Sequence, residues 1–145
     1  MFKGEEMKLI RLSKNFYDEY KTCKEILQKH SRPYIYLTVK IHDVKFAIPF
    51  RHHIKHNHAF ITYGTCGLDY TKAVVISSSD YIEIGSVIVD QKDFDAIKGK
   101  ERRISNGMKK YVDEYIKALK YKNNDCYKNI LKYSSLQYFE KFIIK

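Results

Sequence analysis

Two strand-like segments separated by a very short turn set the first constraint on the fold. Residues 34–41 and 44–48 are rich in β-branched and aromatic side chains, which favour extended backbone. Only His42 and Asp43 lie between them, and a two-residue connection of this kind predicts a β-hairpin. We expect Pro49 to end the hydrogen-bond ladder of the second strand, because proline has no backbone N–H to donate.

Similar residue patterns predict further strands on both sides of this hairpin. They cover residues 7–12, 59–63 and 72–76, and an extended segment over 81–89 is interrupted at Gly85. Short turns separate them, among them 64–67 and the serine run 77–79.

Helical periodicity characterises the other segments. Ser13 is suited to cap a helix that runs to about His30, where Pro33 would break it. Asp90 or Asp93 can cap a short helix that ends at Gly99. The longest predicted helix covers residues 102–123. One of its faces carries the apolar residues Ile104, Met108, Tyr111, Val112, Tyr115, Ile116 and Leu119.

The order of these segments predicts an α+β fold with a largely antiparallel, twisted sheet. The 145 residues suit one domain over 1–145. Met7 opens the first strand-like segment, so we expect residues 1–6 to be a non-native or alternative-start extension.

The net charge indicates the class of binding partner, and the cysteine content indicates the cellular compartment. The net charge is +10, and most of this excess lies after residue 97, which favours a polyanionic partner such as nucleic acid. Three cysteines without a CxxC pair argue against a disulfide framework. No apolar run is long enough to span a bilayer and no apolar leader is present, so we expect a cytoplasmic protein without a membrane partner.

A basic segment after the hairpin carries the strongest chemical signal. Residues 49–58 hold four of the six histidines together with Arg51 and Lys55, and no Asp or Glu occurs from Val44 to Leu68. Arginine and lysine can hold a phosphate, and a histidine can give or take a proton at neutral pH. These groups suit RNA cleavage by the neighbouring 2′-hydroxyl, without a metal or other cofactor.

Two other interpretations of this segment stay open. His52, His56 and His58 have spacings that occur in metal sites, as in a metal-dependent nuclease, although neighbouring cations disfavour a metal ion. The segment can also be a solvated basic loop of a noncatalytic RNA-binding or DNA-binding module.

Residues elsewhere are weaker candidates for RNA contacts. Arg32 precedes the hairpin, and Thr71 and Lys72 follow a turn in which we expect Asp69 to form an Asx turn. Lys109 and Lys110 on the long helix suit nonspecific phosphate contacts.

Three stretches of the chain resemble the ToxN/AbiQ-like type III toxins, with the TenpN and CptN branches nearest. These stretches are residues 46–56 (FAIPFRHHIKH), 59–62 (AFIT) and 67–73 (GLDYTKA). Residues 7–12, 14–16, 99–101, 111–112 and 115–118 are also similar to that family, so the likeness spans nearly the whole chain from Met7. The family's type member has Thr-Ser-Pro-Lys after its strand-ending proline. Here Arg51, His52 and His53 stand in the first three places, and a one-residue offset brings Lys55 onto the lysine.

The resemblance implies a compact, strongly twisted antiparallel sheet flanked by helices. It implies a metal-independent endoribonuclease that leaves 2′,3′-cyclic phosphate and 5′-hydroxyl ends. It further implies inhibition by a small repeat-derived RNA pseudoknot, the antitoxin, which assembles with the toxin into a closed RNA–protein oligomer.

These considerations together predict roles for named residues. We expect Arg51 and Lys55 to hold the scissile phosphate, His53 or His56 to transfer protons, and His52 and His58 to support them. Arg32, Thr71 and Lys72 would border the RNA groove.

Overall fold

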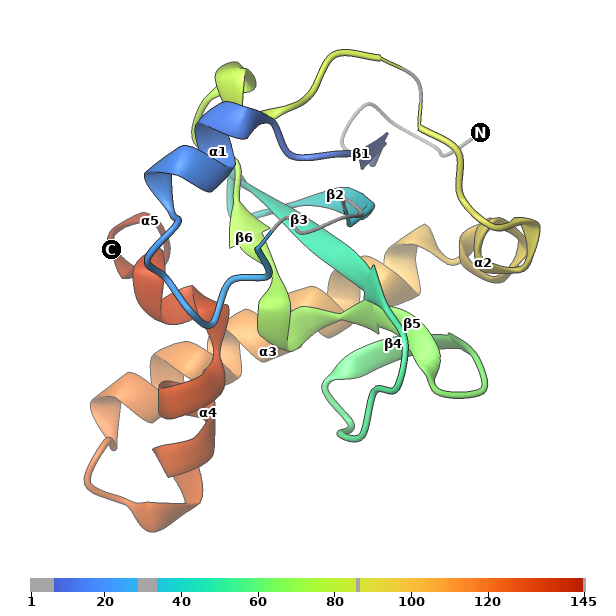
Figure 1. The fold of residues 1–145 in the computed structure, drawn as a ribbon. Coiled ribbons are helices and arrows are strands. Elements are labelled where there is room, and N and C mark those ends of the chain that lie inside the picture. The colour runs from blue at the N-terminus through green and yellow to red at the C-terminus, as the bar shows by residue number, and fades with distance from the viewer. Residues whose placement is uncertain (1–6, 29–33, 86, 145) are drawn as a thin grey trace.

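An eight-residue strand, β3 (Val44–Arg51), organises the sheet by pairing on both of its edges. The computed structural model describes residues 7–28, 34–85 and 87–144. Within these ranges six antiparallel strands form one sheet in the order β1-β2-β3-β5-β4, and β6 also pairs with β3 (Figure 1). The other strands are β1 (Leu9–Ile10), β2 (Tyr36–Ile41), β4 (Ala59–Tyr63), β5 (Cys66–Asp69) and β6 (Val74–Val75).

The predicted hairpin is confirmed as β2 and β3. His42 and Asp43 form the turn with φ angles of 50° and 65°, and two consecutive positive φ angles are what a type I′ hairpin turn requires. The register pairs Ile41 with Val44 and continues to Tyr36 and Pro49.

The expectation that Pro49 ends this strand is wrong, since β3 continues to Arg51. The N–H of Phe50 donates to the carbonyl of Ile35 at 2.9 Å, so the nitrogen of Pro49 faces the other edge of β3. On that edge β3 pairs with β6 at Phe46 and Ala47, and with β5 at Phe50 and Arg51. Pro49 therefore lies between these two sets of pairs, where no ladder hydrogen bond is lost.

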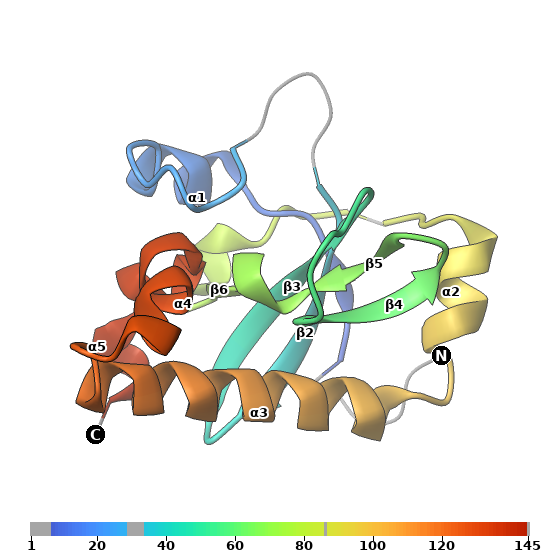
Figure 2. The ribbon, with the colours of Figure 1, turned by 90° about the horizontal axis from the view of Figure 1, so that it is seen from below.

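The helices lie around the sheet, and the α+β prediction is confirmed. Their bounds are α1 (Lys14–Glu19), α2 (Gln91–Ile97), α3 (Glu101–Lys120), α4 (Lys128–Tyr133) and α5 (Glu140–Ile143). Figures 1 and 2 show α3 along one face of the sheet and α1 on the opposite side. None of the helices in the described ranges combines the length and apolar character that crossing a bilayer requires.

The apolar face of α3 is buried as its spacing predicts. Its buried residues are Ile104, Met108, Tyr111, Val112, Tyr115 and Ala118, and all but Ala118 join the core formed by β2, β3 and the C-terminal helices. The other two predicted residues, Ile116 and Leu119, are partly buried and pack against this core. Gly107 lies on the same helix under the ring of Tyr70, whose hydroxyl donates to the carbonyl of Ile104 at 3.0 Å. A Cβ at Gly107 would come within 2.3 Å of the Tyr70 hydroxyl oxygen, so the close approach requires glycine.

The first helix is shorter than predicted, although Ser13 caps it as expected. It ends at Glu19 instead of continuing toward His30, and His30 and Pro33 lie outside the described residues. The Gln28 side-chain amide donates to the carbonyls of Tyr20, Cys23 and Ile26, at 3.1, 3.2 and 3.2 Å. These bonds stabilise an irregular chain that buries Ile26.

Three predicted strands are also shorter in the structure. The segment 7–12 contributes β1, which covers only Leu9–Ile10. In the segment 72–76, Lys72 is the last residue of the 3-10 turn Tyr70–Lys72, and β6 covers only Val74–Val75. The extended segment after Tyr81 contributes one β-bridge, between Leu12 and Ile82.

Candidate active site around Asp69

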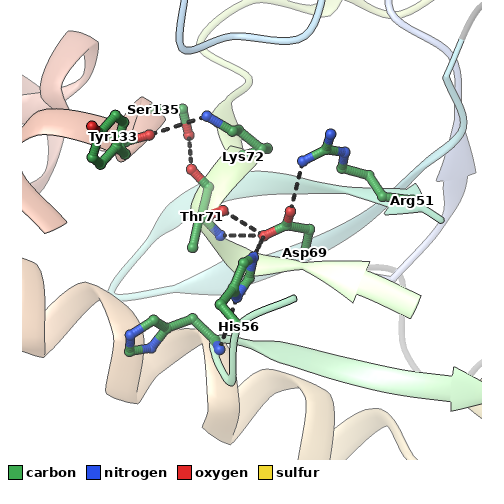
Figure 3. A network of polar contacts seen from close by, with 8 residues as sticks. Arg51, His56, Asp69, Thr71, Lys72, Tyr133 and Ser135 are labelled. Atoms are coloured by element: carbon green, nitrogen blue, oxygen red, sulfur yellow. Dashed lines mark hydrogen bonds and ion pairs between the residues drawn. The ribbon is translucent and has the colours of Figure 1, made fainter. Parts of the chain in front are cut away.

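A buried carboxylate collects the basic residues at the end of β3. Asp69, the last residue of β5, is 0% exposed. It accepts hydrogen bonds from Arg51 and Thr71, and His56 lies within ion-pair distance (Figure 3). Arg51 Nη1 lies 3.0 Å from one of its oxygens, and His56 Nε2 lies 3.2 Å from the other. Thr71 donates to the second oxygen through its backbone N–H at 2.9 Å and its hydroxyl at 2.5 Å. A buried carboxylate needs such partners to offset its desolvation.

Local sequence and strand pairing place these groups together. The antiparallel register sets Arg51 opposite Gly67 at the end of β3, two residues before Asp69 on β5. The Thr71 contacts form the predicted Asx turn and start the 3-10 turn Tyr70–Lys72. His56 arrives from the 52–58 loop that connects β3 with β4 (Figure 3). We refer to Arg51, His56, Asp69, Thr71 and Lys72 as the Asp69 cluster.

Both ring nitrogens of His56 are engaged. Nδ1 accepts the backbone N–H of His58 at 3.1 Å, which assigns the proton of a neutral ring to Nε2, the atom that faces Asp69. In this arrangement neither nitrogen has a free lone pair for a substrate proton. The geometry therefore makes His56 a positioning residue that joins the loop to Asp69.

Lys72 adds a second cation to the cluster and ties it to the C-terminal helices. Its Nζ donates to the carbonyl of Tyr133 at 3.1 Å, and the Ser135 hydroxyl donates to the carbonyl of Thr71 at 3.1 Å. Burial lowers the pKa of Lys72 from its ordinary 10.5, and the charge of Arg51 acts in the same direction, against the attraction of Asp69. Arg51 pairs with Asp69 whereas Lys72 has no carboxylate partner among the described residues, which leaves the cluster suited to an additional anion.

The remaining loop residues do not reach Asp69. Ile54 anchors the loop, because its side chain is buried and its N–H donates to the carbonyl of Thr65 at 2.9 Å. Lys55 and His53 are exposed, and His53 has a φ of 59°. His52 is also exposed, with Nδ1 2.9 Å from the sulfur of Cys66.

The other predicted RNA-binding residues have separate surroundings. His58 lies against Tyr111, with ring centroids 5.3 Å apart. On α3, Lys109 pairs with Asp113 at 3.0 Å, whereas Lys110 lines a cleft beside His58. Arg32 lies outside the described residues.

The three histidines considered as metal ligands do not form one set. His52 contacts Cys66, His56 contacts Asp69 and His58 contacts Tyr111. In residues 7–28, 34–85 and 87–144, no three or more His, Cys, Asp or Glu side chains form a group that could hold a metal ion. The donors nearest Asp69 are cations and N–H groups, whose charge fits an anion.

Sequence reasoning assigned Asp69 a turn but missed that it also binds Arg51 and His56. One signal for this role was present, since Asp69 is the first acidic residue after the acid-free segment 44–68. The involvement of Ser135 and the Tyr133 carbonyl had no sequence signal, because both come from more than 60 residues away.

The arrangement can therefore bind a phosphate beside a set of fixed donors. Comparisons of this chain with protein-family models, with curated proteins and with solved structures found no match.

Proposed function

We propose that this protein is a metal-independent endoribonuclease, the toxin of a type III toxin–antitoxin pair. The observation that carries the proposal is the convergence of Arg51, His56 and Thr71 on the buried carboxylate of Asp69, with the charge of Lys72 nearby. The cluster lies at the end of a 25-residue segment without acidic side chains, in a chain of net charge +10. The resemblance of residues 46–56, 59–62 and 67–73 to the ToxN/AbiQ-like toxins supports the same activity.

The proposed reaction is an internal transesterification of RNA. The 2′-oxygen loses its proton and bonds to the adjacent phosphorus, while the bond from phosphorus to the 5′-oxygen breaks and that oxygen gains a proton. The products are a 2′,3′-cyclic phosphate and a 5′-hydroxyl. Arg51 and Lys55 bind the phosphate and stabilise the charge that develops on it. Lys72 adds positive charge at the border of the groove.

Proton transfer is assigned to a residue of the 52–58 loop and not to the Asp69 cluster. His56 accepts the N–H of His58 at Nδ1 and faces Asp69 with Nε2, so we assign it the orientation of the loop. We assign the transfer to the exposed imidazole of His53, since an imidazole can give and take protons at neutral pH.

The proposed partners are cellular RNA as substrate and a repeat-derived RNA pseudoknot as antitoxin, joined with the toxin in a closed RNA–protein oligomer in the cytoplasm. The high positive charge favours such partners, because phosphate contacts release counterions from RNA.

Incubation of the purified protein with cellular RNA in EDTA tests the activity. We expect cleavage to persist in EDTA and the 3′ ends to carry cyclic phosphate. Arg51→Ala and Lys55→Ala should lower cleavage by about 10²-fold or more, as loss of a charge-stabilising donor does in other enzymes. Lys45→Ala is the matched control, because Lys45 is also exposed and lies at the far end of β3. Cleavage that stops in EDTA, or Arg51→Ala and Lys55→Ala proteins that cut as well as Lys45→Ala, would refute the proposal.

A noncatalytic RNA-binding module is the second candidate. The engagement of both nitrogens of His56 favours it, since that histidine then only shapes the surface. It predicts salt-dependent RNA binding with no turnover in any buffer, with or without divalent cations.

A further inference from the structure

A cleft between the start of β4 and the middle of α3 adjoins the Asp69 cluster. It has a volume of about 580 Å³, and Figure 2 shows α3 running beneath β4 at this place. Small-molecule sites in proteins are commonly of about 300–1,000 Å³, so a nucleotide fits the available space.

Aromatic side chains form the walls of this cleft. His58 and Phe60 line it on the strand side, and Tyr111 lines it on the helix side. The rings of His58 and Tyr111 already contact each other at 5.3 Å between centroids. Gly107, which has no side chain, forms part of the lining next to Tyr70. Bases stack on aromatic surfaces of this kind with about 1–3 kcal/mol per base.

Charged residues on one stripe of α3 border the same cleft. Arg103, Lys110 and Glu114 all line it, and they lie on one helix face because their spacings are close to whole numbers of turns. Arginine and lysine suit the phosphate of a nucleotide. The two oxygens of a carboxylate suit a base that presents two adjacent N–H donors. Guanine has such an edge, whereas uracil offers one N–H between two carbonyls.

The loop joins this cleft to the cluster. The backbone N–H of His58 donates to His56 Nδ1, and the ring centroids of these two histidines are 6.1 Å apart. The carbonyl of His58 accepts the N–H of Tyr70, the residue after Asp69. His56 and His58 therefore form a continuous connection between the Asp69 cluster and the cleft.

We propose that this cleft is a nucleotide subsite that binds the base next to the scissile phosphate and prefers guanine. The inference deepens the proposed function and rests on it for the identity of the ligand as single-stranded RNA. Arg103 and Lys110 contact the flanking phosphate, the half-buried ring of His58, backed by Tyr111, stacks with the base, and Glu114 accepts from its N–H edge.

Binding of 5′-GMP and 5′-UMP, followed by the amide NMR signals of the intact protein, tests the base preference. We expect GMP to shift signals of cleft residues and to bind at least about 10-fold more tightly than UMP, the order of one charge-assisted hydrogen bond. Glu114→Gln should remove most of this difference, because an amide has one acceptor and one donor group in place of two acceptors. Equal affinities for GMP and UMP, or shifts confined to other surfaces, would overturn the inference.

Salt dependence of RNA binding tests the charged border. The double variant R103A/K110A is compared with R102A/K117A, which removes the same charge from exposed positions of α3 outside the cleft. Each phosphate contact contributes about 0.7 to the slope of log affinity against log salt for single strands. We therefore expect the slope for a short single-stranded RNA to fall by about 1.4 in R103A/K110A and to stay unchanged in the control.

These readouts separate the inference from the proposed activity. A protein that binds GMP in the cleft but never cuts RNA would refute the endoribonuclease and keep the subsite. A protein that cuts RNA while R103A/K110A behaves like its control would keep the endoribonuclease and refute the subsite.

Discussion

Replacement of Asp69 by asparagine isolates the role of the buried carboxylate. Asparagine keeps one oxygen for Thr71 and His56 but turns its amide N–H₂ toward Arg51, so one donor faces another donor. A hydrogen bond to a charged group contributes about 1.5–3 kcal/mol. The side chains of Arg51 and His56 are 33% and 34% exposed, and water can partly replace the lost bond. We therefore expect the free energy of unfolding to fall by about 2 kcal/mol, in the lower half of that range.

Urea denaturation followed by circular dichroism measures this loss. At about 2–4 °C per kcal/mol for a chain near this length, the melting temperature should fall by ~4–8 °C. Asp113→Asn is the matched control, because Asp113 is 50% exposed and pairs with Lys109 on the surface. Such pairs contribute about 0–1 kcal/mol, so the control should change little.

The same variant separates RNA binding from RNA cleavage. Asp69→Asn removes a negative charge beside Arg51 and Lys72, so affinity for single-stranded RNA should stay equal or rise. Cleavage should fall by about 10²-fold, because a displacement of about 1 Å in a positioning group can cost that much. Equal stability of Asp69→Asn and Asp113→Asn, together with unchanged cleavage, would refute the claim that Asp69 organises the cluster.

Two further predictions follow from close packing and from burial of charge. Gly107→Ala should lower the free energy of unfolding, measured by urea denaturation, by about 1–2 kcal/mol. Alanine favours the helix by ~1 kcal/mol relative to glycine, but its Cβ must displace the Tyr70 ring, which costs more. A more stable Gly107→Ala protein would show that the Tyr70 ring moves freely. Burial makes the pKa of Lys72 lower in the folded state than in the unfolded chain. Between the folded pKa and 10.5 the unfolded chain therefore binds more protons, and the free energy of unfolding rises with pH in this window. The difference in urea midpoint, wild type minus Lys72→Met, should therefore increase from pH 8 to pH 10, and a constant difference would contradict the burial of the charge.

Features that depend on neighbouring residues were predictable from the sequence. The His42–Asp43 turn, the Ser13 and Asp90 caps and the buried face of α3 each follow from residues within a few positions. The Asx turn at Asp69 belongs to the same class, because Thr71 is two residues away.

Features that depend on distant residues were not predictable. The early end of α1 relies on Gln28, whose amide binds carbonyls up to eight residues earlier in the chain. The bond from Arg51 to Asp69 depends on the register between β3 and β5, which no single segment determines. His56 therefore had to be treated as a free imidazole until the register was known, although the structure engages both of its nitrogens.

β3 pairs with β2 over most of its length but with β5 only at its end, so the two strand pairings differ in extent. The β2–β3 register spans six residue pairs, whereas β3 and β5 share two, at Phe50 and Arg51. Sub-global opening in proteins begins where few bonds hold an element. Backbone amides of β4 and β5 should consequently exchange with deuterium sooner than those of β2. The β4–β5 pair, to which the 52–58 loop leads, would then separate from β3 while the β2–β3 hairpin stays paired.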